Sequence, residues 1–220
     1  MNRPVALPLQ VTGSAGLLQV VAEEPMEASD PAPQAFAVVC HPHPLHGGTM
    51  DNKVVTTLAR SFHALGLPTL RFNYRGVGSS QGSWDEGRGE TEDALAVLAA
   101  GRARWPGAVP WLAGFSFGGY VAFSASTHAQ GADVARLVTI APALPRHYPD
   151  PARVPVPPCP WLVVQGGADE VIDPQQVIDW SRQVPAQPQL VVLPNVGHFF
   201  HGQLEALRGH VLAFARIGAA

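Results

Sequence analysis

The chain has 220 residues, 46% of them hydrophobic and 14% charged, which is enough to bury one sizeable core and requires no second domain. Its formal net charge of −3 gives no electrostatic reason to expect nucleic acid or a membrane surface as a partner. No leader pattern and no run of about 20 apolar residues is found, so we expect a cytoplasmic protein with one domain over residues 1–220. Two cysteines, Cys40 and Cys159, are too few for a disulfide framework.

The first predicted elements are a pair of strands. Residues 7–11 and 17–23 flank the turn-forming segment 13–16 and predict an antiparallel hairpin. Residues 24–34 contain three prolines and predict a loop. The continuous apolar run at 36–40 then predicts a strand that is buried on both faces.

Strands and helices alternate in the rest of the chain. Apolar runs predict strands at 69–74, 111–113, 137–140, 161–164 and 190–193, and apolar residues at helical spacing predict helices within 54–65, 94–99, 120–128, 174–184 and 203–215. This alternation predicts a mostly parallel sheet of about eight strands with helices on both faces. Ligands bind at the carboxyl edge of such a sheet.

The segment Gly114-Phe115-Ser116-Phe117-Gly118 fits the pattern G-x-S-x-G, and it lies between a predicted strand and a predicted helix. A serine on such a turn has a strained backbone, so small residues must stand two positions to either side. The following helix directs its N-terminus at the serine oxygen. Ser116 is therefore the candidate nucleophile. A glycine-rich loop with a chance serine is the alternative unless an acid and a base are also present.

Two later motifs supply an acid and a base. Asp169 follows the strand predicted at 161–164, and His198 follows the strand predicted at 190–193. The order serine, aspartate, histidine is that of the α/β-hydrolase arrangement, and it differs from the orders of the chymotrypsin and subtilisin types. From about residue 35 to its end, the chain resembles a small member of the α/β-hydrolase superfamily. The resemblance implies a serine hydrolase with a triad of Ser116, Asp169 and His198.

Other residues near the two motifs compete for the same roles. Glu170 and Asp173 are alternative acids, but the superfamily pattern Gly-x-x-Asp-x-Val places the acid at Asp169. His201 is an alternative base, but His198 directly follows a small glycine on the loop after the strand.

The loop after the strand at 36–40 is expected to complete an oxyanion hole. It reads His41-Pro42-His43-Pro44-Leu45-His46-Gly47-Gly48 and resembles the superfamily segment His-Gly-x-Pro, with proline in the glycine slot. The resemblance implies that the backbone N–H groups of His43 and Phe117 stabilise the oxyanion. Leu45 remains a competing donor.

The three histidines of this loop also raise the question of a metal site. No carboxylate or cysteine at familiar ligand spacing accompanies them, so we expect no metal and assign their rings to lining or supporting the cleft. Cys40 is expected to be a buried small residue and no nucleophile. The segment Arg75–Ser80 resembles a glycine turn of these hydrolases and is expected to be structural, because it lacks the third glycine of a dinucleotide fingerprint.

Residues 141–160 lie where many of these hydrolases insert a lid, and this proline-rich segment is too short to fold as one. We therefore expect an open cleft that takes a small acyl substrate. Loop position alone suggests its apolar walls: Leu45, Trp84, Phe115, Phe117 and Phe199.

The function predicted from the sequence is hydrolysis of a small carboxylic ester, thioester or lactone through an acyl-enzyme, with no cofactor. A peptidase or amidase on the same scaffold is the first alternative. A binding protein without activity is the second, and it is disfavoured because no triad member is missing. The acyl group, the leaving group and the oligomeric state stay open.

Overall fold

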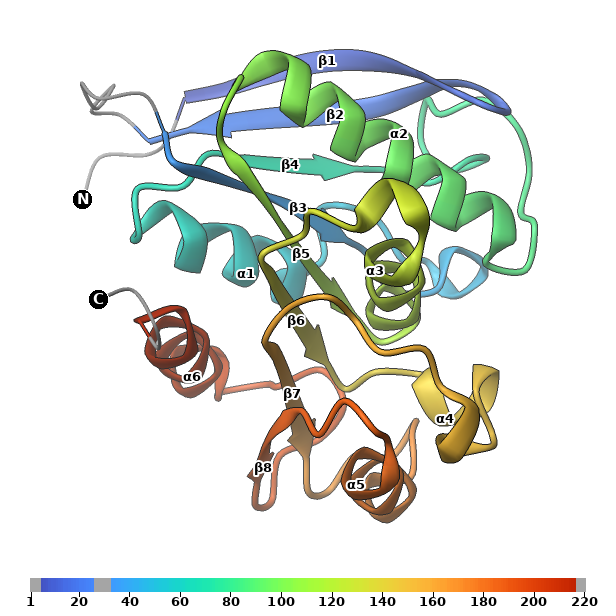
Figure 1. Ribbon diagram of the computed structural model, residues 1–220, viewed down its shortest axis with the longest axis vertical. Helices are drawn as coiled ribbons and strands as arrows, with labels where there is room; N and C mark the ends of the chain where they lie inside the picture. Colours follow the sequence, from blue (N-terminus) through green and yellow to red (C-terminus); the bar gives the residue numbers. More distant parts are fainter. Residues whose placement is uncertain (1–4, 26–32, 217–220) are drawn as a thin grey trace.

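The computed structural model describes residues 5–25 and 33–216, which form a sheet of eight strands with helices on both sides (Figure 1). The strands are β1 (Val5–Gly13), β2 (Gly16–Glu24), β3 (Ala35–Cys40), β4 (Thr69–Phe72), β5 (Val109–Phe115), β6 (Arg136–Ile140), β7 (Trp161–Gly166) and β8 (Gln189–Leu193). Their order is β1-β2-β4-β3-β5-β6-β7-β8. Only the β1–β2 and β2–β4 pairs are antiparallel, which confirms the predicted fold class with its N-terminal hairpin.

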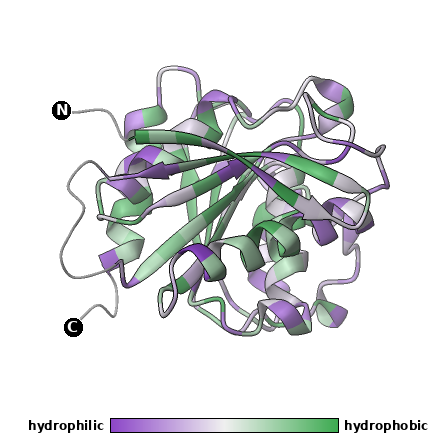
Figure 2. Ribbon diagram, turned by 90° about the horizontal axis from the view of Figure 1, so that it is seen from above, coloured by the Kyte–Doolittle hydropathy of each residue, from purple (hydrophilic) through white to green (hydrophobic). Residues whose placement is uncertain are grey.

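Five long helices cover the two faces of the sheet. Helices α1 (Lys53–His63) and α6 (Leu204–Arg216) pack on one face, and α2 (Arg88–Arg104), α3 (Phe117–Thr127) and α5 (Pro174–Gln183) pack on the other (Figure 1). Strands β3 and β7 are buried at every position because helices cover both of their faces. In Figure 2, hydrophobic residues are concentrated in the central strands and in the helices that cover them.

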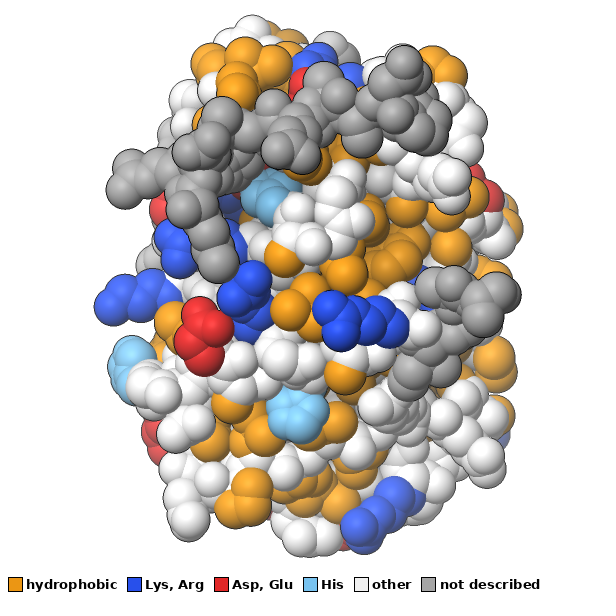
Figure 3. All heavy atoms as spheres, turned by 90° about the vertical axis from the view of Figure 1, so that its left-hand side faces the viewer, with side chains coloured by type: hydrophobic (Ala, Val, Ile, Leu, Met, Phe, Trp, Pro, Cys, Tyr) orange, Lys and Arg blue, Asp and Glu red, His pale blue; other side chains and the backbone are white. Residues whose placement is uncertain are grey.

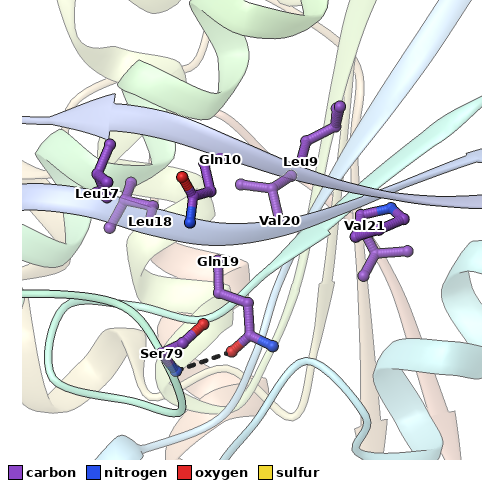
Figure 4. A pocket seen from close by; sticks show the side chains of 9 residues that line it. Leu9, Gln10, Leu17, Leu18, Gln19, Val20, Val21 and Ser79 are labelled. Atoms are coloured by element: carbon purple, nitrogen blue, oxygen red, sulfur yellow. Dashed lines mark hydrogen bonds between the residues drawn. The ribbon is translucent and has the colours of Figure 1, made fainter.

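The hairpin at the edge of the sheet is much more exposed than its centre. Strand β1 pairs with β2 alone, and its first four residues are exposed. A groove of about 430 Å³ runs along the hairpin, where the Gln19 Oε1 atom accepts a hydrogen bond from the Ser79 N–H at 3.0 Å (Figure 4). The face at the left of Figure 1 carries basic and acidic side chains among apolar ones (Figure 3).

The segment between β6 and β7 contains only two short helical elements. These are α4 (Leu144–His147) and the 3-10 turn at Pro151–Arg153. The expectation that no sizeable lid covers the sheet is confirmed.

Candidate active site

Ser116 lies on a strained turn between β5 and α3. Its φ of 57° and ψ of −118° belong to a region that residues with a side chain rarely adopt. Hydrogen bonding and close packing hold the turn, because the Ser116 N–H donates to the Ile140 carbonyl at 2.8 Å. A Cβ at Gly114 would lie 1.9 Å from the Gly118 carbonyl oxygen, and a Cβ at Gly118 would lie 2.3 Å from the Cys40 carbonyl oxygen. Both positions therefore require glycine.

The structure brings Ser116, His198 and Asp169 into one hydrogen-bonded chain. The His198 Nε2 atom lies 3.1 Å from the Ser116 Oγ atom, and its Nδ1 atom lies 2.8 Å from the Asp169 Oδ2 atom. All three residues are buried, with exposed fractions of 8%, 3% and 7%. A carboxylate only accepts, so Nδ1 carries the proton and Nε2 is free to accept from the serine hydroxyl.

Asp169 is held ionised by four donors. Its Oδ1 atom accepts the N–H groups of Val171 and Ile172 at 2.9 and 2.8 Å, and its Oδ2 atom accepts from His198 and from Gln165 Nε2 at 3.0 Å. Burial raises the pKa of Asp169, but the hydrogen bonds from His198 and the backbone outweigh it and lower the pKa below its usual value. A negative charge is thus fixed beside the imidazole.

The competing residues have other partners. The Glu170 Oε2 atom accepts the backbone N–H of His198 at 3.1 Å, so this carboxylate holds the loop that carries the imidazole. Asp173 caps α5 by accepting the Gln175 N–H at 2.9 Å. The ring of His201 stacks on Phe199 with centroids 5.9 Å apart.

His41 fixes the loop after β3. Its fully buried ring donates from Nδ1 to the Pro42 carbonyl at 2.7 Å and accepts the Tyr74 N–H at Nε2, 3.1 Å away. Burial lowers the pKa of His41 to about 4, so the ring is neutral at neutral pH. The Pro42 carbonyl belongs to the same peptide as the His43 N–H, and the planar peptide therefore transmits this restraint to the predicted donor.

Aromatic rings surround Phe117, the residue after the serine. The His43 ring centroid lies 5.1 Å from that of Phe117 and 4.6 Å from that of Trp84. The buried Glu90 carboxylate holds the Trp84 loop by accepting the N–H groups of Asp85 and Gly87 at 3.0 and 2.7 Å. Trp84 thus packs against His43 and Phe117, the two predicted oxyanion donors.

The other predicted wall residues differ in exposure. Phe115 is fully buried and supports the His198 ring from the protein side, with centroids 4.9 Å apart, so it offers no surface to a ligand. Phe199 is 42% exposed and also contacts the imidazole, at 5.1 Å. Leu45 is 67% exposed, on a single 3-10 turn (Pro44–His46).

The Arg75–Ser80 turn is fixed by a buried ion pair and by hydrogen bonds to its neighbours. Arg75 forms a buried ion pair with Asp93 of α2, with its Nη2 atom 2.8 Å from Oδ1, and the Arg75 N–H donates to the same carboxylate. Ser80 bridges the strands by donating to the Asn73 carbonyl at 2.7 Å and accepting the Gln19 N–H at 2.9 Å.

Within residues 5–25 and 33–216, no three histidine, cysteine or acidic side chains are close enough to hold a metal ion. No helix there has the length and apolarity needed to cross a bilayer. A groove of about 480 Å³ beside α1, like the hairpin groove, is lined by none of the predicted site residues.

Three comparisons relate this chain to known proteins. A family model described as serine aminopeptidase, S33 matches residues 33–157, a range that includes Ser116 and the His41–Gly48 loop. A Xanthomonas campestris crystal structure, described as a member of the α/β serine hydrolases without a lid, is 43% identical with a TM-score of 0.88. The alignment covers 96% of this chain and 94% of that chain.

A Coxiella burnetii structure, described as an α/β serine hydrolase homologue, is 42% identical with a TM-score of 0.85, over 94% of this chain and 96% of that one. An uncharacterized protein of Rickettsia prowazekii is 32% identical over 177 residues, which is 77% of this chain and 74% of the relative.

Proposed function

The chain belongs to the α/β-hydrolase superfamily, in the family of the matched serine aminopeptidase model, and on this premise we propose that it hydrolyses small carboxylic esters through a Ser-His-Asp triad. The observation that carries the proposal is the chain of hydrogen bonds from Asp169 through His198 to Ser116 at the strained turn. Thioesters and lactones present the same carbonyl chemistry and belong to the same class.

Each triad member has one task in this mechanism. His198 Nε2 takes the Ser116 proton as the oxygen attacks the carbonyl carbon, and Asp169 stabilises the imidazolium that forms. The same Nε2–H then protonates the departing alkoxide, which leaves an ester bond between Ser116 and the acyl group. Water, activated by His198, attacks this acyl-enzyme and releases the acid together with free Ser116.

The oxyanion formed at each step is assigned to the N–H groups of Phe117 and His43. Phe117 is the first residue of α3, so its N–H has no partner within the helix. Gly118 allows the start of α3 to lie close to the Cys40 carbonyl, directly before the loop of His43, because a Cβ there would lie 2.3 Å from that oxygen. A donor of this kind contributes roughly 3 kcal/mol to transition-state stabilisation.

Covalent labelling tests the proposed nucleophile. A fluorophosphonate should add one label per chain, at Ser116, and Ser116→Ala should abolish labelling. Ser79→Ala is the matched control, because Ser79 is exposed on a glycine turn away from the triad. Labelling that persists in Ser116→Ala contradicts the assignment.

A peptidase is the second candidate, and the description of the matched family model is the observation that favours it. Purified protein should be assayed against short p-nitrophenyl esters, acyl thioesters, lactones and aminoacyl p-nitroanilides. We expect turnover of the esters. Turnover of the anilides alone would replace the esterase proposal with an aminopeptidase.

A further inference from the structure

Helix α4 places Arg146 at the edge of the triad loops. The exposed Arg146 donates from Nη2 to the Val171 carbonyl at 2.6 Å, and the Val171 N–H donates in turn to Asp169. In Figure 1, α4 lies beside α3 and α5, at the position between β6 and β7 where no lid is inserted. The guanidinium thus binds the loop of the triad acid, at the residue two positions after Asp169.

Three histidines share this rim with Arg146. The His147 ring stacks on Tyr120 with centroids 3.6 Å apart and lies 6.1 Å from the Phe117 ring. The His43 ring also contacts Phe117, with centroids 5.1 Å apart, and its centroid is 4.6 Å from that of His46. The residue next to the nucleophile is therefore flanked by two imidazole rings that can donate hydrogen bonds.

Among the described residues, Arg146 forms no ion pair with a carboxylate. Several other arginines form ion pairs with acidic side chains, for example Arg71 with Glu23 and Arg102 with Asp133, whereas Arg146 bonds a carbonyl. The Glu170 carboxylate, next to Val171 in the chain, accepts the His198 N–H and, among the described residues, forms no ion pair with Arg146.

The pKa values of two of these histidines are lowered. Burial lowers the pKa of His43, and the positive groups of His46 and Arg146 lower it further. Partial burial also lowers the pKa of His147, with added contributions from His43 and Arg146. At neutral pH, Arg146 is thus a permanent cation beside the neutral rings of His43 and His147.

We infer that this rim, made of Arg146, His43, His46 and His147, binds a carboxylate group of the substrate, so that the preferred substrates are esters that carry a free carboxylate. The inference rests on the proposed esterase function. A guanidinium has five N–H donors in a planar fork that matches a carboxylate, and only the Nη2 group is engaged by Val171. A cationic amino terminus would meet like charge here, which opposes an aminopeptidase.

Matched ester pairs test the inference. The first pair is the mono-p-nitrophenyl ester of adipic acid and p-nitrophenyl hexanoate, which carry the charge difference on the acyl side. The second pair is the butyrate ester of 4-hydroxybenzoate and that of its methyl ester, with the difference on the leaving group. The measured quantity is the ratio of kcat/KM for the anionic over the neutral ester.

For one of the two pairs we expect Arg146→Gln to lower this ratio about tenfold, since a glutamine is polar but carries no charge. Arg146→Lys should retain part of the preference, and added salt should reduce it in the unmodified protein. Arg153→Gln is the control: Arg153 is exposed on the next turn, pairs with Asp150, and should leave the ratio unchanged.

The two proposals fail in different ways. Ratios that Arg146→Gln leaves unchanged for both pairs, or an equal fall for anionic and neutral esters, overturn the carboxylate site. Absence of both ester hydrolysis and fluorophosphonate labelling in the unmodified protein overturns the esterase itself.

Discussion

Two loops at the carboxyl edge of the sheet each bury a histidine ring, and the two rings differ only in what they bond. His41, after β3, is fully buried and lies between two backbone groups, the Pro42 carbonyl and the Tyr74 N–H. His198, after β8, is 3% exposed and lies between a carboxylate and a hydroxyl. Burial is thus nearly the same for the two rings. Their hydrogen-bond partners differ, so that the His41 ring only holds a loop, whereas the His198 ring can move a proton.

Burial lowers the pKa of His41 to about 4, because the bond to the Pro42 carbonyl compensates only part of the cost of a buried positive charge. The carboxylate of Asp169 is ionised and stabilises a cation on the ring it contacts.

Removing the proton acceptor should have the largest effect. His198→Ala is expected to lower kcat for a p-nitrophenyl ester by about 10⁵-fold or more, because Ser116 then has no base. His201→Ala, which removes the alternative histidine, should change kcat less than about twofold. The reverse pattern would assign the base to His201.

Asp169→Asn should lower kcat by about 10⁴-fold with little change in fold. The amide can donate to Nδ1 and favour the wrong tautomer, so Nε2 would carry the proton and could not accept from Ser116. Steady-state kinetics together with a thermal melt measure the two effects. Activity near that of the unmodified protein would identify Glu170 or Asp173 as the acid.

Gly118→Ala should lower kcat by about 100-fold and also destabilise the fold, because its Cβ would lie 2.3 Å from the Cys40 carbonyl oxygen and separate α3 from the His43 loop. Gly209→Ala is the control. No atom lies within 4 Å of its added Cβ in helix α6, so a stabilisation of about 0.5–1 kcal/mol is expected. Equal effects of the two changes on kcat would remove the close-packing argument.

His41 should make the fold sensitive to acid. The unfolded ring binds a proton below its ordinary pKa of 6.5, whereas the native ring does so only near 4. Between these values the unfolded state holds more protons, so stability falls as the pH falls, by about 2 kcal/mol from pH 7.5 to pH 5. Urea unfolding at both pH values measures the loss, which His41→Gln should reduce. An unchanged loss in that variant would show that His41 is not its source.

Glu170 should have the smallest effect. Glu170→Ala removes the acceptor for the His198 N–H and is expected to lower kcat about fivefold, while Glu170→Gln retains an acceptor oxygen and restores part of it. If both variants lose activity equally, the charge of Glu170 matters more than its hydrogen bond, and a shift in the pH profile of kcat/KM should accompany the loss.

The sheet was predictable because each parallel strand is a local apolar run followed by a loop. The start of α2 was not, since its first turn is polar and depends on Glu90 contacting the preceding loop. The turn of Ser116 and the loops of Asp169 and His198 carry short motifs, so their meeting at one edge followed from strand order.

The supporting residues of the site carried no such signal. His41 bonds a backbone group 33 positions away, and Glu170 reaches the loop of His198 28 positions away. Gln165 stands at the end of an apolar strand with nothing in its neighbours to mark it as a partner of Asp169. Arg146 is ordinary in the sequence, and only the fold shows that its charge lacks a counter-ion among the described side chains.

The thiol of Cys40 can serve as a chemical probe for opening of the central sheet. It ends β3 in the middle of the sheet, is fully buried, and burial raises the pKa of its thiol to about 12. Neither thiolate nor access is then available to an alkylating reagent in the native state. The rate at which iodoacetamide modifies this sulfur, resolved from Cys159 by peptide mapping, therefore reports how often the central strands separate.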